Sequence, residues 1–175
     1  MHNVSNALAC IAICNSYGIP KTNIKDALLE FTGANRRLEY KGTFNNASIF
    51  DDYAHHPTEI VATANAIKNK HFNESWCIFQ PHTYSRTKNL LDDFAKALLN
   101  FDNVIVTDIY AAREDNTYNI SSQDLVDKIN ELGKKAIYIS DFNNIANYLK
   151  NHVHGDDIII TLGAGTITNL SKYLI

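Results

Sequence analysis

The sequence predicts an α/β fold: a Rossmann-like, mostly parallel sheet with one antiparallel strand and helices on both faces, preceded by a helical pair. Three observations support this. After residue 35, short β-branched or aromatic runs alternate with amphipathic stretches, which is typical of a layered α/β domain. The later runs are continuously apolar, as in parallel strands buried on both faces. Residues 1–33 show helical periodicity and no strand pattern.

Composition limits the class of protein. The chain has 175 residues, 45% of them hydrophobic, and a net charge of −3, as expected for one globular domain with an appended piece. The slight acidity argues against nucleic acid as a partner. The chain has no apolar run near the ~18 residues of a membrane span, and its start lacks the basic region of a signal peptide. The odd number of cysteines (Cys10, Cys14 and Cys77) indicates buried thiols in a reducing, cytoplasmic compartment.

The N-terminal segment predicts two helices. Apolar residues recur at helical spacing from Val4 to Tyr17, and Gly18 is placed to end that helix. A second helix follows Pro20, with Thr22 or Asn23 as its N-cap, and stops before Gly33. We therefore expect a domain boundary near residue 34, which separates residues 1–34 from residues 35–175.

The remainder predicts six strands and five helices. Only Asn45-Asn46 separates the first two strands, so they should form an antiparallel hairpin. The expected strands are 38–44, 47–51, 75–80, 103–107, 136–139 and 157–161. The expected helices are 57–69, 86–100, 122–132, 141–151 and 167–174.

Polar residues gather at the junctions where strands end. Ligands of open α/β sheets bind beyond the carboxyl ends of the strands, so these junctions are candidate binding segments. The four stretches are ASIFDDYAHHPTEI (47–60), CIFQPHTYSRTKNLL (77–91), VIVTDIYAARED (104–115) and IIITLGAGT (158–166).

Each cluster also has a structural interpretation. His55 and His56 are adjacent and point in different directions, so we expect no metal site. Asp51, Asp52 and Glu59 could cap the helix that begins near Pro57, and capping is favoured for Asp51 and Glu59.

Two further segments could contact anions. The GAGT loop at 163–166 could hold a phosphate or be a tight turn. Arg36 and Arg37 lie in a linker that contains glycine, which favours an anion contact over a solvated pair. A triphosphate loop of the form GxxxxGK[ST] does not occur in the sequence.

In chain order, six stretches resemble the C-terminal part of the Mur ligases. HHPTE and QPHTYSRT favour the branch of that family that joins L-alanine to UDP-N-acetylmuramate. The matching stretches are HNVSNALA (2–9), FTGANRRLE (31–39), DDYAHHPTEI (51–60), FQPHTYSRT (79–87), DIYAARE (108–114) and GAGT (163–166).

The resemblance implies a three-domain, cytoplasmic ligase of peptidoglycan biosynthesis that uses ATP and Mg²⁺ and forms an acyl phosphate. The phosphate loop and metal ligands would lie upstream. Residues 1–34 would then be the helical end of the central ATP-binding domain and residues 35–175 the C-terminal domain. This chain alone would be inactive.

The resemblance also assigns residues. The nucleotide would be contacted by His2, Asn3 and Asn6 at adenine, and by Arg37 and Asp52 at ribose or phosphate. L-Alanine would be held by Tyr53, His55, His82 and Arg86, of which His55, His82 and Arg86 would be catalytic.

Two neighbouring positions qualify this assignment. His56 would be structural. Thr83 stands where some family members have a second arginine, so the alanine carboxylate would depend more on Arg86.

Three alternatives remain open. A related recycling ligase attaches a tripeptide to the same muramyl sugar. The domain could instead bind a nucleotide without catalysis. A dinucleotide-binding oxidoreductase would need GxGxxG after an early strand, whereas the glycine cluster of this sequence follows the last expected strand.

Overall fold

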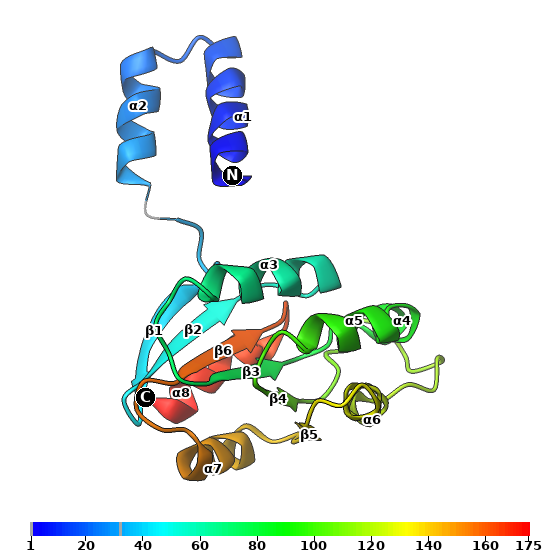
Figure 1. The fold of residues 1–175 in the computed structure, drawn as a ribbon. Coiled ribbons are helices and arrows are strands. Elements are labelled where there is room, and N and C mark those ends of the chain that lie inside the picture. Colours follow the sequence, from blue (N-terminus) through cyan, green and yellow to red (C-terminus); the bar gives the residue numbers. More distant parts are fainter. Residues whose placement is uncertain (1, 32) are drawn as a thin grey trace. The chain divides into compact units, whose positions relative to one another are not determined.

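The chain, described by a computed structural model, divides into two compact units, one reaching to Asn35 and the other running from Arg36 to Ile175. The structure describes residues 2–31 and 33–175, without the side chains of His2 and Asn3. The first unit is a helical pair and the second contains the sheet (Figure 1).

The first unit consists of α1 (His2–Ser16) and α2 (Lys21–Glu30). Gly18, with φ of 73°, follows the end of α1, as expected. The expected N-cap of α2, Thr22 or Asn23, is wrong because α2 begins at Lys21 after Pro20. Proline has φ fixed near the helical value, and the Pro20 carbonyl already accepts from the Ile24 N–H at 3.2 Å.

Much of the apolar surface of the first unit is exposed. Val4 is 65% and Leu8 60% exposed, whereas Ile24 is buried. Cys10 is exposed and Cys14 is partly exposed, so the expectation of buried thiols is wrong for both. Two helices without a third element in their unit can bury only a narrow seam. Cys77, in the second unit, is buried as expected.

In the described part of the second unit, six strands form one sheet in the order β1-β2-β6-β3-β4-β5. All neighbouring pairs are parallel except β1 and β2. This confirms the predicted fold class. The strands are β1 (Glu39–Phe44), β2 (Ala47–Asp52), β3 (Ser75–Phe79), β4 (Asn103–Val106), β5 (Ala136–Tyr138) and β6 (Ile158–Leu162).

Helices cover both faces of this sheet (Figure 1). Along β3, Cys77 and Phe79 face one apolar core, while Trp76 and Ile78 face the other, as the two-residue period of a strand requires. The first core lies under α3 (Pro57–Ile67), α5 (Leu91–Leu98) and α6 (Ser122–Glu131). The second lies under α7 (Phe142–His152), the 3₁₀ helix η1 (Thr166–Leu170) and α8 (Ser171–Leu174).

The hairpin between β1 and β2 is confirmed. Asn45 and Asn46 both have positive φ, 51° and 67°, as a two-residue turn of this kind needs. The expected helix 86–100 is wrong as a single element, because it divides at Leu90 into α4 (Tyr84–Asn89) and α5. Leu90 and Leu91 both pack on the first core, so tertiary packing overrides the local helical pattern.

The described helices include none that is long and apolar enough to cross a membrane.

Candidate functional site

The four predicted junctions meet at the carboxyl edge of the sheet. The Gln80 N–H donates to the Leu162 carbonyl at 2.9 Å, and the Tyr110 N–H donates to the Pro81 carbonyl at 2.8 Å. An isolated parallel bridge joins His82 and Tyr110. The loops are therefore extensions of the sheet, and their side chains are held by its hydrogen bonds.

An aromatic row crosses this edge from one loop to the next. The ring centroids of Tyr53 and His55 lie 5.3 Å apart, and those of His55 and His82 lie 5.8 Å apart. Tyr110 stacks on His82 at 5.5 Å. Arg86 joins the row, because its guanidinium lies 3.4 Å from His82 Nδ1 and donates to the His82 carbonyl at 3.2 Å. The structure thus brings together Tyr53, His55, His82 and Arg86.

The two imidazoles of the row differ in their hydrogen-bond partners. Burial, and then the positive charge of Arg86, lower the pKa of His82. His82 is therefore neutral at pH 7, and its Nδ1 can accept from the guanidinium. His55 Nδ1 lies 3.0 Å from the Tyr53 carbonyl oxygen, which can only accept, so His55 carries its proton on Nδ1. In this tautomer the lone pair of the His55 ring is on Nε2.

The start of α3 fixes the neighbouring turn. His56 is the N-cap of α3, and the Glu59 carboxylate accepts from the backbone N–H groups of His55 and His56 at 3.0 and 3.1 Å. This reciprocal arrangement is a capping box. It confirms the structural interpretation of His56 and Glu59, and it orients the backbone of His55.

The two aspartates that end β2 are both buried. The Asp51 carboxylate does not cap α3, so that expectation is wrong: it accepts from Arg36 Nε at 2.9 Å and from the Thr161 hydroxyl at 2.6 Å. Asp51 points toward β6, where a buried carboxylate needs a cation and donors.

Asp52 is fixed by local backbone donors. Its carboxylate accepts from the N–H groups of Leu38 at 2.9 Å and Ala54 at 2.8 Å. Burial raises its pKa against the lowering effect of these donors.

Arg36, which the sequence marked with Arg37 as a candidate anion contact and to which the resemblance gave no role, links three segments. Besides Asp51, its guanidinium donates to the carbonyls of Gly163 and Gly165, and it lies over the Tyr53 ring at 4.9 Å. The GAGT loop therefore presents two carbonyls to a fixed arginine. The signal in the sequence was the pair Arg36-Arg37, but only the fold reveals which arginine is half-buried.

The other candidate nucleotide contacts are distributed over both units of the chain. The side chains of His2 and Asn3 are outside the described part of the chain. Asn6 is exposed on α1, and Arg37 is exposed at the start of the second unit.

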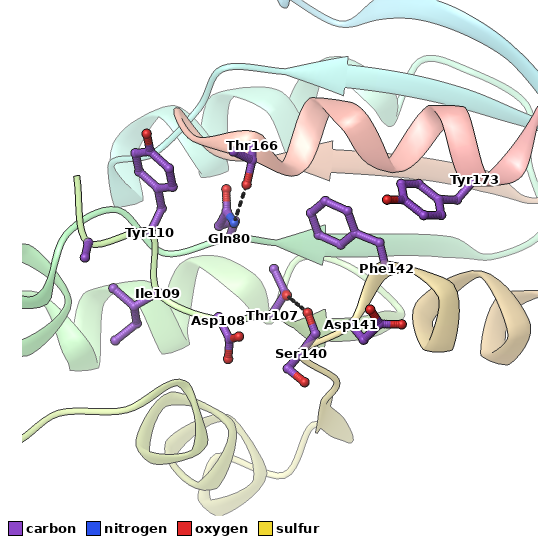
Figure 2. A pocket seen from close by; sticks show the side chains of 11 residues that line it. Gln80, Thr107, Asp108, Ile109, Tyr110, Ser140, Asp141, Phe142, Thr166 and Tyr173 are labelled. Carbon is purple, nitrogen blue, oxygen red and sulfur yellow. Dashed lines mark hydrogen bonds between the residues drawn. The ribbon is translucent and has the colours of Figure 1, made fainter.

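A cavity of about 360 Å³ opens beside the aromatic row (Figure 2). It contains the carboxylates of Asp108 and Asp141 and the aromatic pair Phe142 and Tyr173, whose centroids lie 5.8 Å apart. Of the described residues that line it, none is a lysine or arginine. The cavity therefore does not suit a phosphate, and the two arginines assigned by resemblance, Arg37 and Arg86, do not line it.

Within residues 2–31 and 33–175, no three His, Cys, Asp or Glu side chains are placed to hold a metal ion.

The chain is similar to one family of known proteins. The sequence model of the protein family described as "Mur ligase, glutamate ligase domain" matches residues 36–165 of this chain. The chain is 50% identical over 172 residues to UDP-N-acetylmuramate–L-alanine ligase of Acetivibrio thermocellus, covering 98% of this chain and 37% of that protein. It is 49% identical to the ligase of the same name from Lachnospira eligens, covering 100% and 38%. The chain thus spans less than two fifths of the length of these relatives.

Solved structures agree with this comparison. A UDP-N-acetylmuramate–alanine ligase from Thermotoga maritima has a TM-score of 0.75 and 31% identity, covering 99% of this chain and 37% of that one. A murein peptide ligase from Psychrobacter arcticus has a TM-score of 0.73 and 25% identity, covering 99% and 36%.

Proposed function

The chain belongs to the Mur ligase family, and on that premise we propose that it is the C-terminal part of an ATP-dependent UDP-N-acetylmuramate–L-alanine ligase of peptidoglycan biosynthesis. Residues up to 34 would be the helical end of the ATP-binding domain, and residues 35–175 the C-terminal domain. The identity of 50% to a relative of that name supports the assignment.

The observation that carries the proposal is the cluster at the carboxyl edge in which Arg86 contacts His82 and His82 packs against His55. L-Alanine is a zwitterion, so its site needs a cation for the carboxylate and a proton acceptor for the ammonium. Arg86, at 3.4 Å from His82, supplies a planar guanidinium that can hold a carboxylate through two parallel hydrogen bonds.

His55 and His82 would act on the ammonium group of L-alanine in different ways. His55 Nε2 carries the free lone pair and accepts a proton from the ammonium, which makes the amine a nucleophile. His82 is neutral because its pKa is lowered, so it adds no positive charge that would repel the ammonium. When Arg86 turns to a bound carboxylate, it also releases His82 Nδ1 as a second acceptor. Tyr53 closes one side of the site.

ATP would supply the phosphoryl group that activates the muramyl carboxylate, and Mg²⁺ would balance the phosphate charge. The exposed guanidinium of Arg37 suits a ribose or phosphate contact. Asp52 offers only the lone pairs that remain after two backbone N–H groups are bound. His2, Asn3 and Asn6 would lie at adenine. The metal ligands would come from the rest of the full-length protein, and the isolated chain should hydrolyse no ATP.

The test is Arg86→Lys in the full-length protein, with each substrate varied in turn. Lysine keeps the charge but loses the planar fork, so kcat/KM for alanine should fall about 10- to 150-fold, the usual worth of a hydrogen bond to a charged group. The KM for ATP should stay unchanged. Arg113→Lys, an exposed arginine, is the matched control. A raised KM for ATP with an unchanged KM for alanine would place Arg86 at the phosphates and refute the assignment.

A tripeptide ligase is the second candidate, because the solved structure of a murein peptide ligase matches this chain with nearly the same TM-score, 0.73. The two candidate functions differ in the amine that is joined to the muramyl carboxylate: that of L-alanine or that of a tripeptide. Offering L-alanine and the tripeptide separately to the full-length protein decides between them, and a higher kcat/KM for tripeptide would replace the first candidate.

A further inference from the structure

The side chain of Glu114 reaches from the loop after β4 to the first turn of α4. Its Oε2 accepts from the Ser85 N–H at 2.9 Å, and its Oε1 accepts from the Ser85 hydroxyl at 2.5 Å. These two hydrogen bonds, with the Ser85 donors, lower the pKa of Glu114. The carboxylate is therefore charged at neutral pH and joins two segments 29 residues apart.

The helix that Glu114 contacts lacks a cap from its own residues. Thr83 occupies the N-cap position of α4, yet within this described helix its side chain makes no capping bond. The Thr83 hydroxyl lies instead 3.1 Å from the Ser85 hydroxyl. The first N–H groups of any helix need acceptors from outside its ladder, and here the acceptor is a charged group on another loop.

The length of α4 makes this external acceptor important. The helix has 6 residues, far fewer than the roughly 12 that an isolated helix needs to be stable in water. Arg86 is in its first turn, immediately after Ser85, and reaches back to His82. The direction of the Arg86 guanidinium therefore depends on how firmly this turn is held.

We propose that Glu114 is a positioning residue: it caps α4 from the neighbouring loop and so holds Arg86 and His82 in the geometry that binds the substrate carboxylate. This inference rests on the proposed function of Arg86. In this proposal Glu114 acts through Arg86 and not by contact with the substrate. Tyr110, on the same loop as Glu114, stacks on His82. The loop after β4 therefore contacts His82 through Tyr110 and the first turn of α4, next to Arg86, through Glu114.

The first measurement is structural and independent of activity. Glu114→Gln in the full-length protein keeps the size of the side chain but removes its charge, so the hydrogen bonds to Ser85 lose the strengthening that an ionised acceptor gives. Hydrogen exchange of peptides covering residues 84–89 should become about tenfold faster. Asp115→Asn, which removes the exposed neighbouring carboxylate, should leave that exchange unchanged. Unchanged exchange in Glu114→Gln would overturn the inference.

The second measurement separates positioning from general loss of structure. Glu114→Gln should raise the KM for alanine about tenfold and leave the KM for ATP and the thermal midpoint near wild type. Ser85→Ala, which removes one of the two donors, should give a smaller effect in the same direction.

Arg86→Lys distinguishes the two ways in which the idea can fail. If Arg86→Lys raises the KM for alanine and Glu114→Gln does not, the positioning role is refuted and the proposed function stands. If neither changes it, the assignment of Arg86 is wrong and the inference fails with it.

Discussion

Replacing Arg36 by methionine should destabilise the Arg36–Ile175 unit by about 3 kcal/mol. The Arg36 side chain is 19% exposed and that of its partner Asp51 only 1%. Removing one partner of a buried ion pair costs roughly 3–5 kcal/mol, because the other charge remains buried without compensation. We expect the lower end of this range, since Arg36 is partly solvated and the Thr161 hydroxyl still donates to Asp51 at 2.6 Å.

The assay is urea unfolding followed by tryptophan fluorescence. Trp76 is the only tryptophan of the chain and is 5% exposed in β3, so its signal reports on this unit alone. The variant should lower the midpoint with an unchanged slope, which identifies a change in stability. Lys41→Met is the matched control: Lys41 pairs with Glu39 at 2.8 Å near the surface, where such a pair contributes less than about 1 kcal/mol.

A double variant tests the cause. Arg36→Met combined with Asp51→Asn leaves no buried charge, so its loss of stability should be smaller than the sum of the single losses by at least about 1 kcal/mol. If Arg36→Met costs no more than Lys41→Met, or if the two single losses simply add, the reasoning from a stranded buried charge is refuted.

Three further outcomes are expected. Burial raises the pKa of the Cys77 thiol far above its usual range, so Cys77 should resist a thiol reagent at pH 8 while the exposed Cys10 reacts; equal rates would contradict the buried position. The pKa of His82 is lower in the folded protein than in the unfolded chain, so the unfolded chain binds a proton at His82 first as the pH falls. The stability that His82 contributes is therefore present above pH 6.5 and lost as pH falls through its folded pKa. A histidine NMR titration of the folded protein with a midpoint above the usual value would reverse the sign of this pH dependence. Gly165→Ala would bring a Cβ to 2.6 Å from Tyr110 Cγ, and should cost about 1–3 kcal/mol by overpacking, measured by the same urea assay; an unchanged midpoint would mean that the tyrosine ring moves aside freely.

Much of the fold could be predicted because its signals are local. Asn45-Asn46 marks the hairpin, and the apolar runs at 75–80, 103–107 and 157–161 mark strands buried on both faces, whereas the edge strand β5 is only partly buried. The capping box at His56 and Glu59 also follows from neighbouring residues. Such features depend on a few consecutive positions, and the structure confirms them.

The features that could not be predicted depend on residues far apart in the chain. Asp51 was expected to cap a helix, but its partners Arg36 and Thr161 lie 15 and 110 positions away. Glu114 was visible in a family motif, yet its contact with Ser85 became apparent only from the fold. The division between α4 and α5 at Leu90 has no proline or glycine to mark it in the sequence. It results from the packing of Leu90 on the first core. The clustering of His55, His82 and Arg86 could be anticipated, since parallel strands end at one edge, whereas their roles rest on resemblance.

The position of β6 in the sheet has a consequence for biogenesis. β6 is the last of the six strands to leave the ribosome, yet it lies between β2 and β3 (Figure 1). Until Ile158–Leu162 has emerged, the hairpin and the β3-β4-β5 portion cannot pair, and the facing edges of β2 and β3 are open to other chains. A nascent chain that stalls before residue 158 would therefore be an aggregation-prone pair of incomplete sheets, and the unit can reach its native state only after almost all of it has been synthesised.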